Sequence, residues 1–354
     1  WDVTSSTFVF DSSAPYTTVT SPVWGSTYSA LSILQGTMED EPTRTDSTKS
    51  SAGIQGVEIT IQRMTDLYYY QGTGESWASS AYYMFASTTA GSPSTWSRSQ
   101  AQGLPAWQHD VNYWIVARSS DRANNVETGY TDQVDSITVR FDVYGASVAV
   151  TNFGSTNSVT GPFYVNASMN FIAGTSRDEP ADISTVTVAI SSNNGIGNSW
   201  YNGTGFTSAF SSNTTIYRST SSYTEGSPID SWEYDANNII PNSLQDGATY
   251  LLRVRSADKA SAQNVKAQDF TFIYDAVPPT ATITFPGNNY STNTSISISG
   301  TSNDFGSGVS TITISIDKNG DGGTDCYRPA ATAFDGTCPF WFAAGGNHLG
   351  TWNV

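Results

Sequence analysis

One short pattern recurs three times along the chain: an aromatic residue, a glycine-containing turn and a second aromatic residue. The copies are Tyr-Gln-Gly-Thr-Gly at 70–74 followed by Trp77, Tyr-Asn-Gly-Thr-Gly-Phe at 201–206, and Phe-Asp-Gly-Thr-Cys at 334–338 followed by Phe340. Each copy predicts a β-hairpin, because glycine supplies the positive φ that a tight turn requires. Three copies at similar long spacing predict that one structural blueprint is repeated.

The segments around the hairpin also recur in a fixed order. A strand ending in Gly-Thr and an acid precedes an alternating apolar strand, and a Trp-led strand follows the hairpin. The first two units then add a Tyr-led strand and a closing strand that ends in Asp142 or Asp275. About seven strands in roughly 130 residues, separated by turn signals, are typical of a Greek-key sandwich. The predicted fold is therefore all-β, with tandem Ig-like Greek-key β-sandwiches.

The order of segments predicts four parts: a closing or donor strand at 1–10, Ig-like domains at 11–142 and 143–275, and an incomplete Ig-like domain at 276–354. Proline marks the junctions at 12–15 and 276–279, but not the one at 143–146. The last part lacks a Tyr-led and a closing strand, whereas residues 1–10 have the pattern of a closing strand. Either the chain is a segment of a longer array of repeats, or residues 1–10 of one copy complete the open sandwich of another copy. In the second case Val3, Phe8, Val9 and Phe10 would be the assembly residues. The first explanation is slightly favoured, because residues 1–10 supply one strand whereas two are missing.

The composition limits the partners. Acids outnumber bases 31 to 15, giving a net charge of −16 and a pI near 4.2. This excess argues against nucleic acid and anionic membranes and favours a cation. No hydrophobic run approaches the roughly 20 residues of a membrane span. Cys326 and Cys338 are the only cysteines, and their positions around one hairpin predict a local disulfide and an oxidising, extracytoplasmic setting, with two buried thiols as the alternative.

Taken together, the motifs resemble the bacterial Ig-like repeats of large secreted and cell-surface proteins, which look like stalk and adhesin modules. The residues that carry the resemblance are Gly-Thr-x-x-Asp at 36–40 and 174–178, the hairpin, the Trp-led strand, and the Tyr-led strand that runs into Asp-x-Ala and Asn-Val. The resemblance covers nearly the whole chain. It implies an Ig-like sandwich, an extracellular or cell-surface location and a mechanical or adhesive role.

Related repeats often bind calcium at their junctions, so the resemblance implies candidate ligands in each full unit. In the first unit they are Asp40, Glu41, Asp121 and Asn125, and in the second Asp178, Glu179, Asp258 and Asn264. Electrostatics supports the idea, because acids near the ends of adjacent domains repel each other unless an ion neutralises them. The alternatives are solvated loop acids and, for Asp121 with Asn125, a purely structural Asx turn.

A second calcium candidate is the loop at 317–325, where Asp317, Asn319, Asp321 and Asp325 occupy alternate positions around glycines. Calcium prefers six to eight oxygen ligands, which such a loop can converge on one ion. Arg328 stands where an EF-hand has its bidentate glutamate, and the flanks are strand-like. A polar hairpin turn is the alternative.

Catalysis has little support in the sequence. The two histidines, His109 and His348, lack a Cys or His partner at ligand spacing and a nucleophile-elbow pattern. Tyrosines at 68–70 and 82–83 could stack on surface glycans, although core and edge packing is favoured. We expect a non-enzymatic structural stalk or filament whose partners are other copies or neighbouring repeats. A carbohydrate-binding adhesin module and a non-catalytic part of a secreted enzyme are the alternatives.

Overall fold

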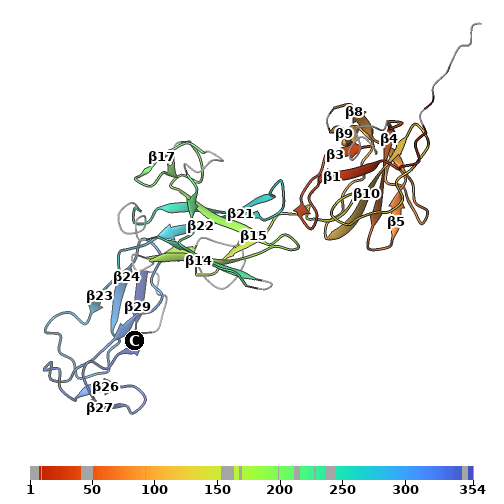
Figure 1. Ribbon diagram of the computed structural model, residues 1–354. Helices are drawn as coiled ribbons and strands as arrows, with labels where there is room; N and C mark the ends of the chain where they lie inside the picture. The colour runs from red at the N-terminus through yellow and green to blue at the C-terminus, as the bar shows by residue number, and fades with distance from the viewer. Residues whose placement is uncertain are drawn as a thin grey trace, which may run out of the picture.

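A computed structural model describes residues 8, 10–40, 51–91, 93–152, 163–166, 170–197, 199–210, 216–226, 229–236, 244–344 and 350–353. The fold is all-β, as predicted: β-sheets stack into sandwiches that follow one another along an elongated, bent molecule (Figure 1). The described residues contain one short 3-10 helix, η1 (Gln100–Gln102). They contain no helix long and apolar enough to cross a membrane.

The first sandwich packs a sheet of order β1-β3-β9-β8 against a sheet of order β2-β11-β10-β4-β5-β6, in which β7 also pairs with β4. Its strands are β1 (Tyr16–Ser21), β2 (Thr27–Tyr28), β3 (Ile33–Glu39), β4 (Ile54–Arg63), β5 (Tyr68–Tyr70), β6 (Trp77–Ala78), β7 (Met84–Phe85), β8 (Ser87–Thr89), β9 (Ser94–Ser99), β10 (Val111–Asp121) and β11 (Ser136–Phe141).

The second sandwich has the same strand order, β12-β14-β20-β19 against β13-β22-β21-β15-β16-β17, with β18 on β15. Its strands are β12 (Ser147–Val150), β13 (Phe163–Val165), β14 (Phe171–Arg177), β15 (Ile183–Ser191), β16 (Trp200–Tyr201), β17 (Phe206–Ser208), β18 (Arg218–Ser219), β19 (Ser222–Thr224), β20 (Asp230–Asp235), β21 (Thr249–Asp258) and β22 (Val265–Tyr274).

The third part contains a sheet of order β23-β24-β29 and two strand pairs, β25-β28 and β26-β27. Its strands are β23 (Thr280–Phe285), β24 (Ser299–Asn303), β25 (Thr313–Ile314), β26 (Cys326–Arg328), β27 (Ala333–Gly336), β28 (Phe342–Ala343) and β29 (Gly350–Asn353). β25 is shorter than the predicted strand at 309–316. No counterpart of β10 or β21 lies on it in the described residues, which explains why its pairing is so short.

In each part, a glycine on one strand packs closely against a tryptophan on the neighbouring strand. Gly36, on β3, is paired with Trp96 on β9, and a Cβ at Gly36 would lie 2.7 Å or less from two atoms of the indole ring. The second and third parts repeat this close approach between Gly174 and Trp232 and between Gly300 and Trp352. Only glycine leaves room for the ring, which explains the recurring Gly-Thr.

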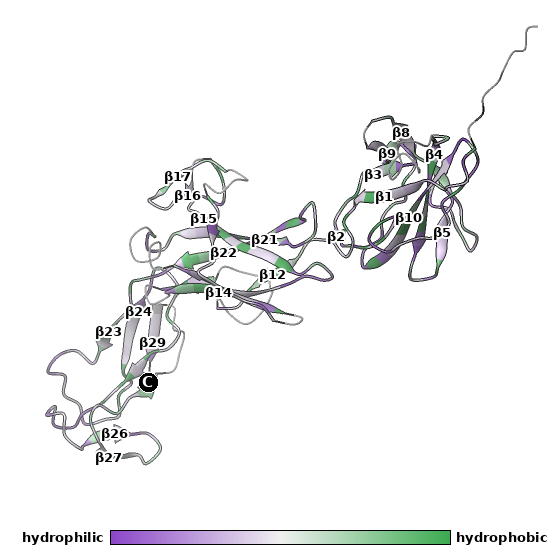
Figure 2. Ribbon diagram, in the orientation of Figure 1, coloured by the Kyte–Doolittle hydropathy of each residue, from purple (hydrophilic) through white to green (hydrophobic). Residues whose placement is uncertain are grey.

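The Tyr-led strands carry a second shared device. Tyr113 accepts a hydrogen bond at its hydroxyl from the backbone N–H of Gln108, 3.1 Å away, and Tyr250 accepts one from Gln245 at 2.7 Å. Such a tyrosine corner is a hallmark of Ig-like sandwiches. Both tyrosines are buried, and hydrophobic residues recur along β10, β21 and β22 between the sheets (Figure 2).

Two of the three predicted hairpins form in the expected register. Tyr70 pairs with Trp77, and Tyr201 with Phe206. The prediction for 334–338 is wrong in detail, because Gly336 lies inside β27, opposite Cys326, and the turn falls at 329–332. Pro329, which lacks a backbone N–H, ends the preceding strand and sets the turn there.

Candidate functional site

Three aspartates meet at one end of the first sandwich. Asp11 precedes β1, Asp40 follows β3 and Asp121 ends β10. One carboxylate oxygen from each lies within 4.8 Å of the other two. Asp40 and Asp121 are buried, so the fold places like charges together in a site with little water.

The same arrangement recurs where the second sandwich begins. Asp142 follows β11, Asp178 follows β14 and Asp258 ends β21, and their carboxylate oxygens also lie within 4.8 Å of one another. Asp142 and Asp258 are fully buried. Since Asp142 directly follows the last strand of the first sandwich, this cluster lies at the junction of the two sandwiches.

Backbone N–H groups hold the aspartates in place. Asp142 accepts hydrogen bonds from the backbone of Tyr144 and Ala181 at 3.2 and 3.1 Å. Asp11 likewise accepts hydrogen bonds from the backbone of Ser13 and Ala52 at 3.0 and 2.7 Å. Each of these hydrogen bonds occupies one acceptor site of an aspartate carboxylate. An ionised carboxylate has about four such sites, so acceptor sites remain on each aspartate.

One asparagine in each cluster links two of the aspartate segments. The side-chain amide of Asn264 donates to Asp258 Oδ2 at 2.8 Å and to the backbone oxygen of Asp142 at 2.9 Å. Asn125 makes the matching pair of bonds, to Asp121 Oδ2 at 2.7 Å and to the backbone oxygen of Asp11 at 3.1 Å. The structural interaction predicted for Asp121 with Asn125 is therefore present, and Asn264 repeats it with Asp258.

Burial, and after it the charge of neighbouring acids, perturbs these aspartates. Burial, followed by the charge of Asp142 and a hydrogen bond with it, raises the pKa of Asp178 to about 7. Burial also raises the pKa of Asp258 and of Asp40, and the charges of Asp11 and Asp121 raise that of Asp40 further. A proton or a cation must neutralise such a cluster near neutral pH.

Further contacts lie at the first junction besides those among the three aspartates. His109 Nδ1 lies 3.1 Å from Asp142 Oδ1, and its ring lies 4.4 Å from that of Tyr144. The backbone N–H of Ser29 donates to Ser261 at 3.0 Å, and that of Ser261 donates to Thr27 at 2.8 Å. The loop after β21 thus adds to the edge of β2 and joins the two sandwiches.

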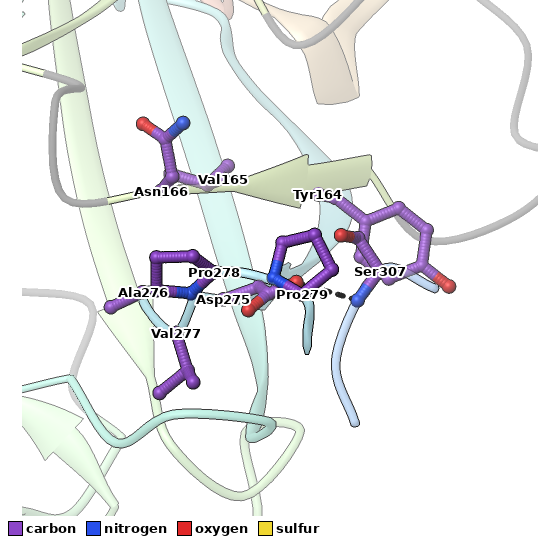
Figure 3. A pocket seen from close by; sticks show the side chains of 9 residues that line it. All are labelled: Tyr164, Val165, Asn166, Asp275, Ala276, Val277, Pro278, Pro279 and Ser307. Atoms are coloured by element: carbon purple, nitrogen blue, oxygen red, sulfur yellow. Dashed lines mark hydrogen bonds between the residues drawn. The ribbon is translucent and has the colours of Figure 1, made fainter. Parts of the chain in front are cut away.

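The third part carries two of the three acid positions. Asp275 follows β22 as Asp142 follows β11, and Asp304 lies four residues after Gly300 as Asp178 does after Gly174. Ser307 links them, donating its N–H to Asp275 at 2.6 Å and its hydroxyl to Asp304 at 3.2 Å. Figure 3 shows Ser307 beside Asp275 in a pocket between β13 and the 276–279 linker. The serine hydrogen bond lowers the pKa of Asp275.

The 317–325 loop also brings three carboxylates together, those of Asp317, Asp321 and Asp325. Asp317 accepts backbone hydrogen bonds from Asn319, Gly320 and Gly322 at 2.8–3.0 Å, which lower its pKa. The side-chain amide of Asn319 donates to Asp325. The 317–325 loop thus has both a hydrogen-bonded polar turn and three carboxylates that lie close together.

Some predicted residues lie elsewhere. Glu179 is exposed, lies 4.0 Å from Arg177 and is not one of the acids that cluster with Asp178. Glu41 lies outside the described residues, as do Val3, Val9 and His348. Phe8 and Phe10 are 88% and 83% exposed.

The structure adds Asp11 and Asp142, which the sequence had indicated only as residues that end closing strands. The signal was present, since an Asp follows the closing strand in each of the three places. What the sequence lacks is the sheet topology that brings this strand end beside the Gly-Thr strand.

The predicted disulfide joins Cys326 and Cys338. The tyrosines at 68–70 and 82–83 form no continuous exposed row: Tyr70 is buried in the core, and Arg118 lies 3.3 Å above the ring of Tyr83. Tyr68 and Tyr82 are exposed. This arrangement gives little support to a glycan-stacking platform.

No protein-family model matches the sequence, and no curated protein matches it. Solved structures that match include fibronectin(III)-like modules of Clostridium thermocellum CbhA, at 13% identity and a TM-score of 0.30, covering 74% of this chain and 95% of that one. A Ca²⁺-stabilised adhesin with which an Antarctic bacterium binds ice matches at 12% identity and a TM-score of 0.31, covering 97% and 66%. A 1.5-MDa bacterial ice-binding adhesin matches at 14% identity and 0.31, covering 97% and 87%. Structural similarities with TM-scores this low do not support any inference about function.

Proposed function

We propose that this chain is a non-catalytic, extracellular structural segment that lines up Ig-like modules as a stalk, and that calcium bound in the two aspartate clusters stiffens the junctions. The observation that carries the proposal is the recurrence of the clusters. The same three strand ends supply the acids in both sandwiches. A single active site would not need this duplication, whereas every junction of a stalk would.

Calcium suits these clusters better than a transition metal. The acids offer hard oxygen ligands, and nearby backbone carbonyls can add more. The 317–325 loop is a third candidate site of the same chemistry. Disulfide bonding of Cys326 and Cys338 supports the extracellular placement, because such bonds persist in oxidising compartments.

Calorimetric titration of the full chain with Ca²⁺ tests the binding step. We expect saturable binding, and we expect Asp178→Asn to remove one site. The matched control is Asp182→Asn, an exposed acid paired with Lys259 at 2.7 Å outside the cluster, which should leave the number of sites unchanged. Absence of saturable binding to the unmodified chain would remove calcium from the proposal.

A second candidate is a filament assembled by strand donation, and the exposure of Phe8 and Phe10 favours it. Their counterparts before Asp142 and Asp275 are buried: Val139 and Phe141 in β11, and Phe272 and Tyr274 in β22. If residues 1–10 insert into another copy, mass photometry should show oligomers that disappear when residues 1–10 are deleted. Monomers in both samples would count against donation.

A further inference from the structure

The first sandwich has a pocket that none of the clustered aspartates lines. Its volume is about 550 Å³, within the range of about 300 to 1,000 Å³ that is typical of small-molecule sites. Three segments form it: the end of β4 with the turn into β5, the turn into β6, and the segment before β10. The lining residues are Arg63, Asp66, Tyr68, Glu75, Trp77 and the 106–108 segment.

Contacts among these segments hold the pocket in shape. Glu75 Oε1 accepts a hydrogen bond from the backbone N–H of Ala106 at 2.9 Å, which ties the β5–β6 hairpin to the segment before β10. The Trp107 ring stacks on the Phe141 ring with 4.4 Å between their centres, and its indole N–H donates to the backbone oxygen of Leu31 at 2.9 Å. The walls are therefore ordered before a ligand arrives, which reduces the entropic cost of binding.

Arg63 connects the polar groups of the pocket. Its guanidinium lies 4.5 Å from the centre of the Trp77 ring and donates two hydrogen bonds to the carboxylate of Asp66, at 2.6 and 3.1 Å. A third bond, at 3.3 Å, goes to the side-chain oxygen of Gln108. The hydrogen bond from Arg63 lowers the pKa of Asp66, so this pair is ionised near neutral pH.

The second sandwich shows that the fold does not require the two tryptophans. Leu244 stands six residues before the corner tyrosine of that sandwich, as Trp107 does in the first. Phe206 pairs with the tyrosine of its hairpin, as Trp77 does. Leu244 and Phe206 both pack against the hydrophobic core. Smaller side chains at these two positions therefore satisfy the same blueprint.

The arginine is also an addition to the blueprint. Arg63 lies opposite the corner tyrosine of the first sandwich. In the second sandwich Ser191 lies opposite Leu251, so the position opposite the corner tyrosine belongs to Ser192. Two large aromatic rings and a charged group thus meet in one sandwich although the other forms without them. Binding of a ligand accounts for this equipment.

The charges of the pocket disfavour an ionic ligand. Asp66 and Glu75 carry two negative charges against the single positive charge of Arg63, and the whole chain has a net charge of −16. An anion would be repelled by this excess. A cation would compete with the guanidinium that already lies over the Trp77 ring. The pocket therefore suits a neutral ligand.

The hydrogen-bonding groups call for a ligand with several hydroxyls. The side-chain NH₂ of Gln108 and the hydroxyl of Tyr68 can each donate a hydrogen bond, and Glu75 has a second carboxylate oxygen that can accept one. The Tyr68 side chain is 43% exposed and adds aromatic surface beside these groups. A sugar ring has the complementary combination, because its hydroxyls surround an apolar face of C–H groups.

We propose that this pocket binds a neutral glycan. A sugar ring would rest on Tyr68, and its hydroxyls would bond with Gln108 and Glu75. Since the exposed tyrosines form no continuous row, one pocket and not an extended platform would carry the binding. The inference goes beyond the proposed stalk, because it gives the first module a ligand that does not depend on calcium.

A glycan array tests the inference. The full chain, in chelator, is applied to neutral glycans built from hexoses, N-acetylhexosamines and fucose, and to sialylated and sulfated glycans on the same array. We expect binding to neutral glycans. The free oligosaccharide of the strongest neutral hit should then give saturable binding in a calorimetric titration.

Variants locate the binding. Arg63→Ser combined with Trp77→Phe gives these positions the residues of the second sandwich and should weaken binding at least about ten-fold, because a charged and an aromatic contact are both lost. Gln108→Ala removes one donor but keeps the backbone bond to the corner tyrosine, and should also weaken binding. The matched control is Arg118→Ser. It removes a guanidinium 3.3 Å from the centre of the Tyr83 ring, outside the pocket, and should leave the affinity unchanged.

Three results would overturn the inference: no neutral glycan is bound, only anionic glycans are bound, or the unmodified chain and the pocket variants bind equally well. A thermal melt of each variant shows whether it is folded, and Gln108→Ala decides the outcome if the double variant is not. Because every sample contains chelator, failure of glycan binding and failure of calcium binding are separate results.

Discussion

Replacing Asp178 by Asn should stabilise the cation-free chain, although most substitutions of buried polar residues destabilise. The carboxylate of Asp178 shares its site with Asp142 and Asp258, and its pKa is raised to about 7 by burial and by Asp142. In chelator near neutral pH the fold must therefore either hold a proton there or bear the repulsion. The Asn side chain has nearly the same shape as that of Asp but carries no charge, so Asp178→Asn removes the free-energy cost of the buried carboxylate.

The size of the effect follows from the pKa. A rise from 3.8 to about 7 spans about three pH units, and each unit corresponds to about 1.4 kcal/mol. The upper bound is about 4 kcal/mol, and because Asp178 is only partly buried and is coupled to Asp142, we expect about 2 kcal/mol. For a sandwich of this size that is a rise in Tm of about 5 to 10 °C.

The pH dependence has a definite sign. Between pH 4 and 7 the folded state holds a proton on Asp178 that the unfolded chain has released, so the cation-free protein loses stability as pH rises through this window. Thermal melts of the chain in chelator at pH 4, 5.5, 7 and 8 should show this decline. Asp178→Asn should flatten it and should also remove the part of the Ca²⁺-induced rise in Tm that this cluster provides.

Asp182→Asn is the matched control. Asp182 is exposed and paired with Lys259, and its charge contributes least to the raised pKa of Asp178, so its loss should flatten the pH profile far less than Asp178→Asn does. A lower Tm for Asp178→Asn at pH 8 in chelator, with an unchanged pH profile, would refute the reasoning that the ionised carboxylate of Asp178 destabilises this cluster.

Three further changes probe the fold. Gly174→Ala places a methyl group 2.0 Å from the backbone oxygen of Ala149 and 2.3 Å from the Trp232 ring and should cost about 3 kcal/mol in chemical unfolding through overpacking; a loss below 0.5 kcal/mol would show that the strand and the ring both shift freely. Tyr250→Phe removes the corner hydrogen bond and should lower stability by about 1 kcal/mol in the same assay, and an unchanged midpoint would contradict a structural role. Replacing Cys326 and Cys338 by Ser frees a short loop and should cost the third part about 3 kcal/mol, seen as faster hydrogen exchange in β26 and β27; equal exchange would show that the bond adds nothing.

Most of the fold could be predicted because the sandwich pattern is local. Alternating apolar residues along 57–61 and 183–190 specify strands with one buried face, and the Gly-Thr and Trp-led segments mark partners on one sheet. The third hairpin was misplaced because two turn signals compete there. Pro329 interrupts the chain six residues before the Asp335-Gly336 pair, and the proline determined the turn.

The candidate site was only half predictable. Asp40, Asp121, Asp178 and Asp258 follow strands whose order the sequence indicates. Asp142 joins them because β11 returns beside β10 and ends next to the Gly-Thr strand, a long-range consequence of topology. Glu179 shows the opposite case: it neighbours Asp178 in sequence, but it lies in the bend after β14, where it is exposed and outside the cluster.

The central claim is that calcium at the clusters holds the modules in line. Small-angle X-ray scattering of the full chain with saturating Ca²⁺ and with chelator measures this directly. The account predicts a narrower distribution of longer particles with Ca²⁺, and a loss of part of this change in Asp178→Asn but not in Asp182→Asn. Superimposable scattering curves with and without Ca²⁺, under conditions where binding is saturated, would contradict it.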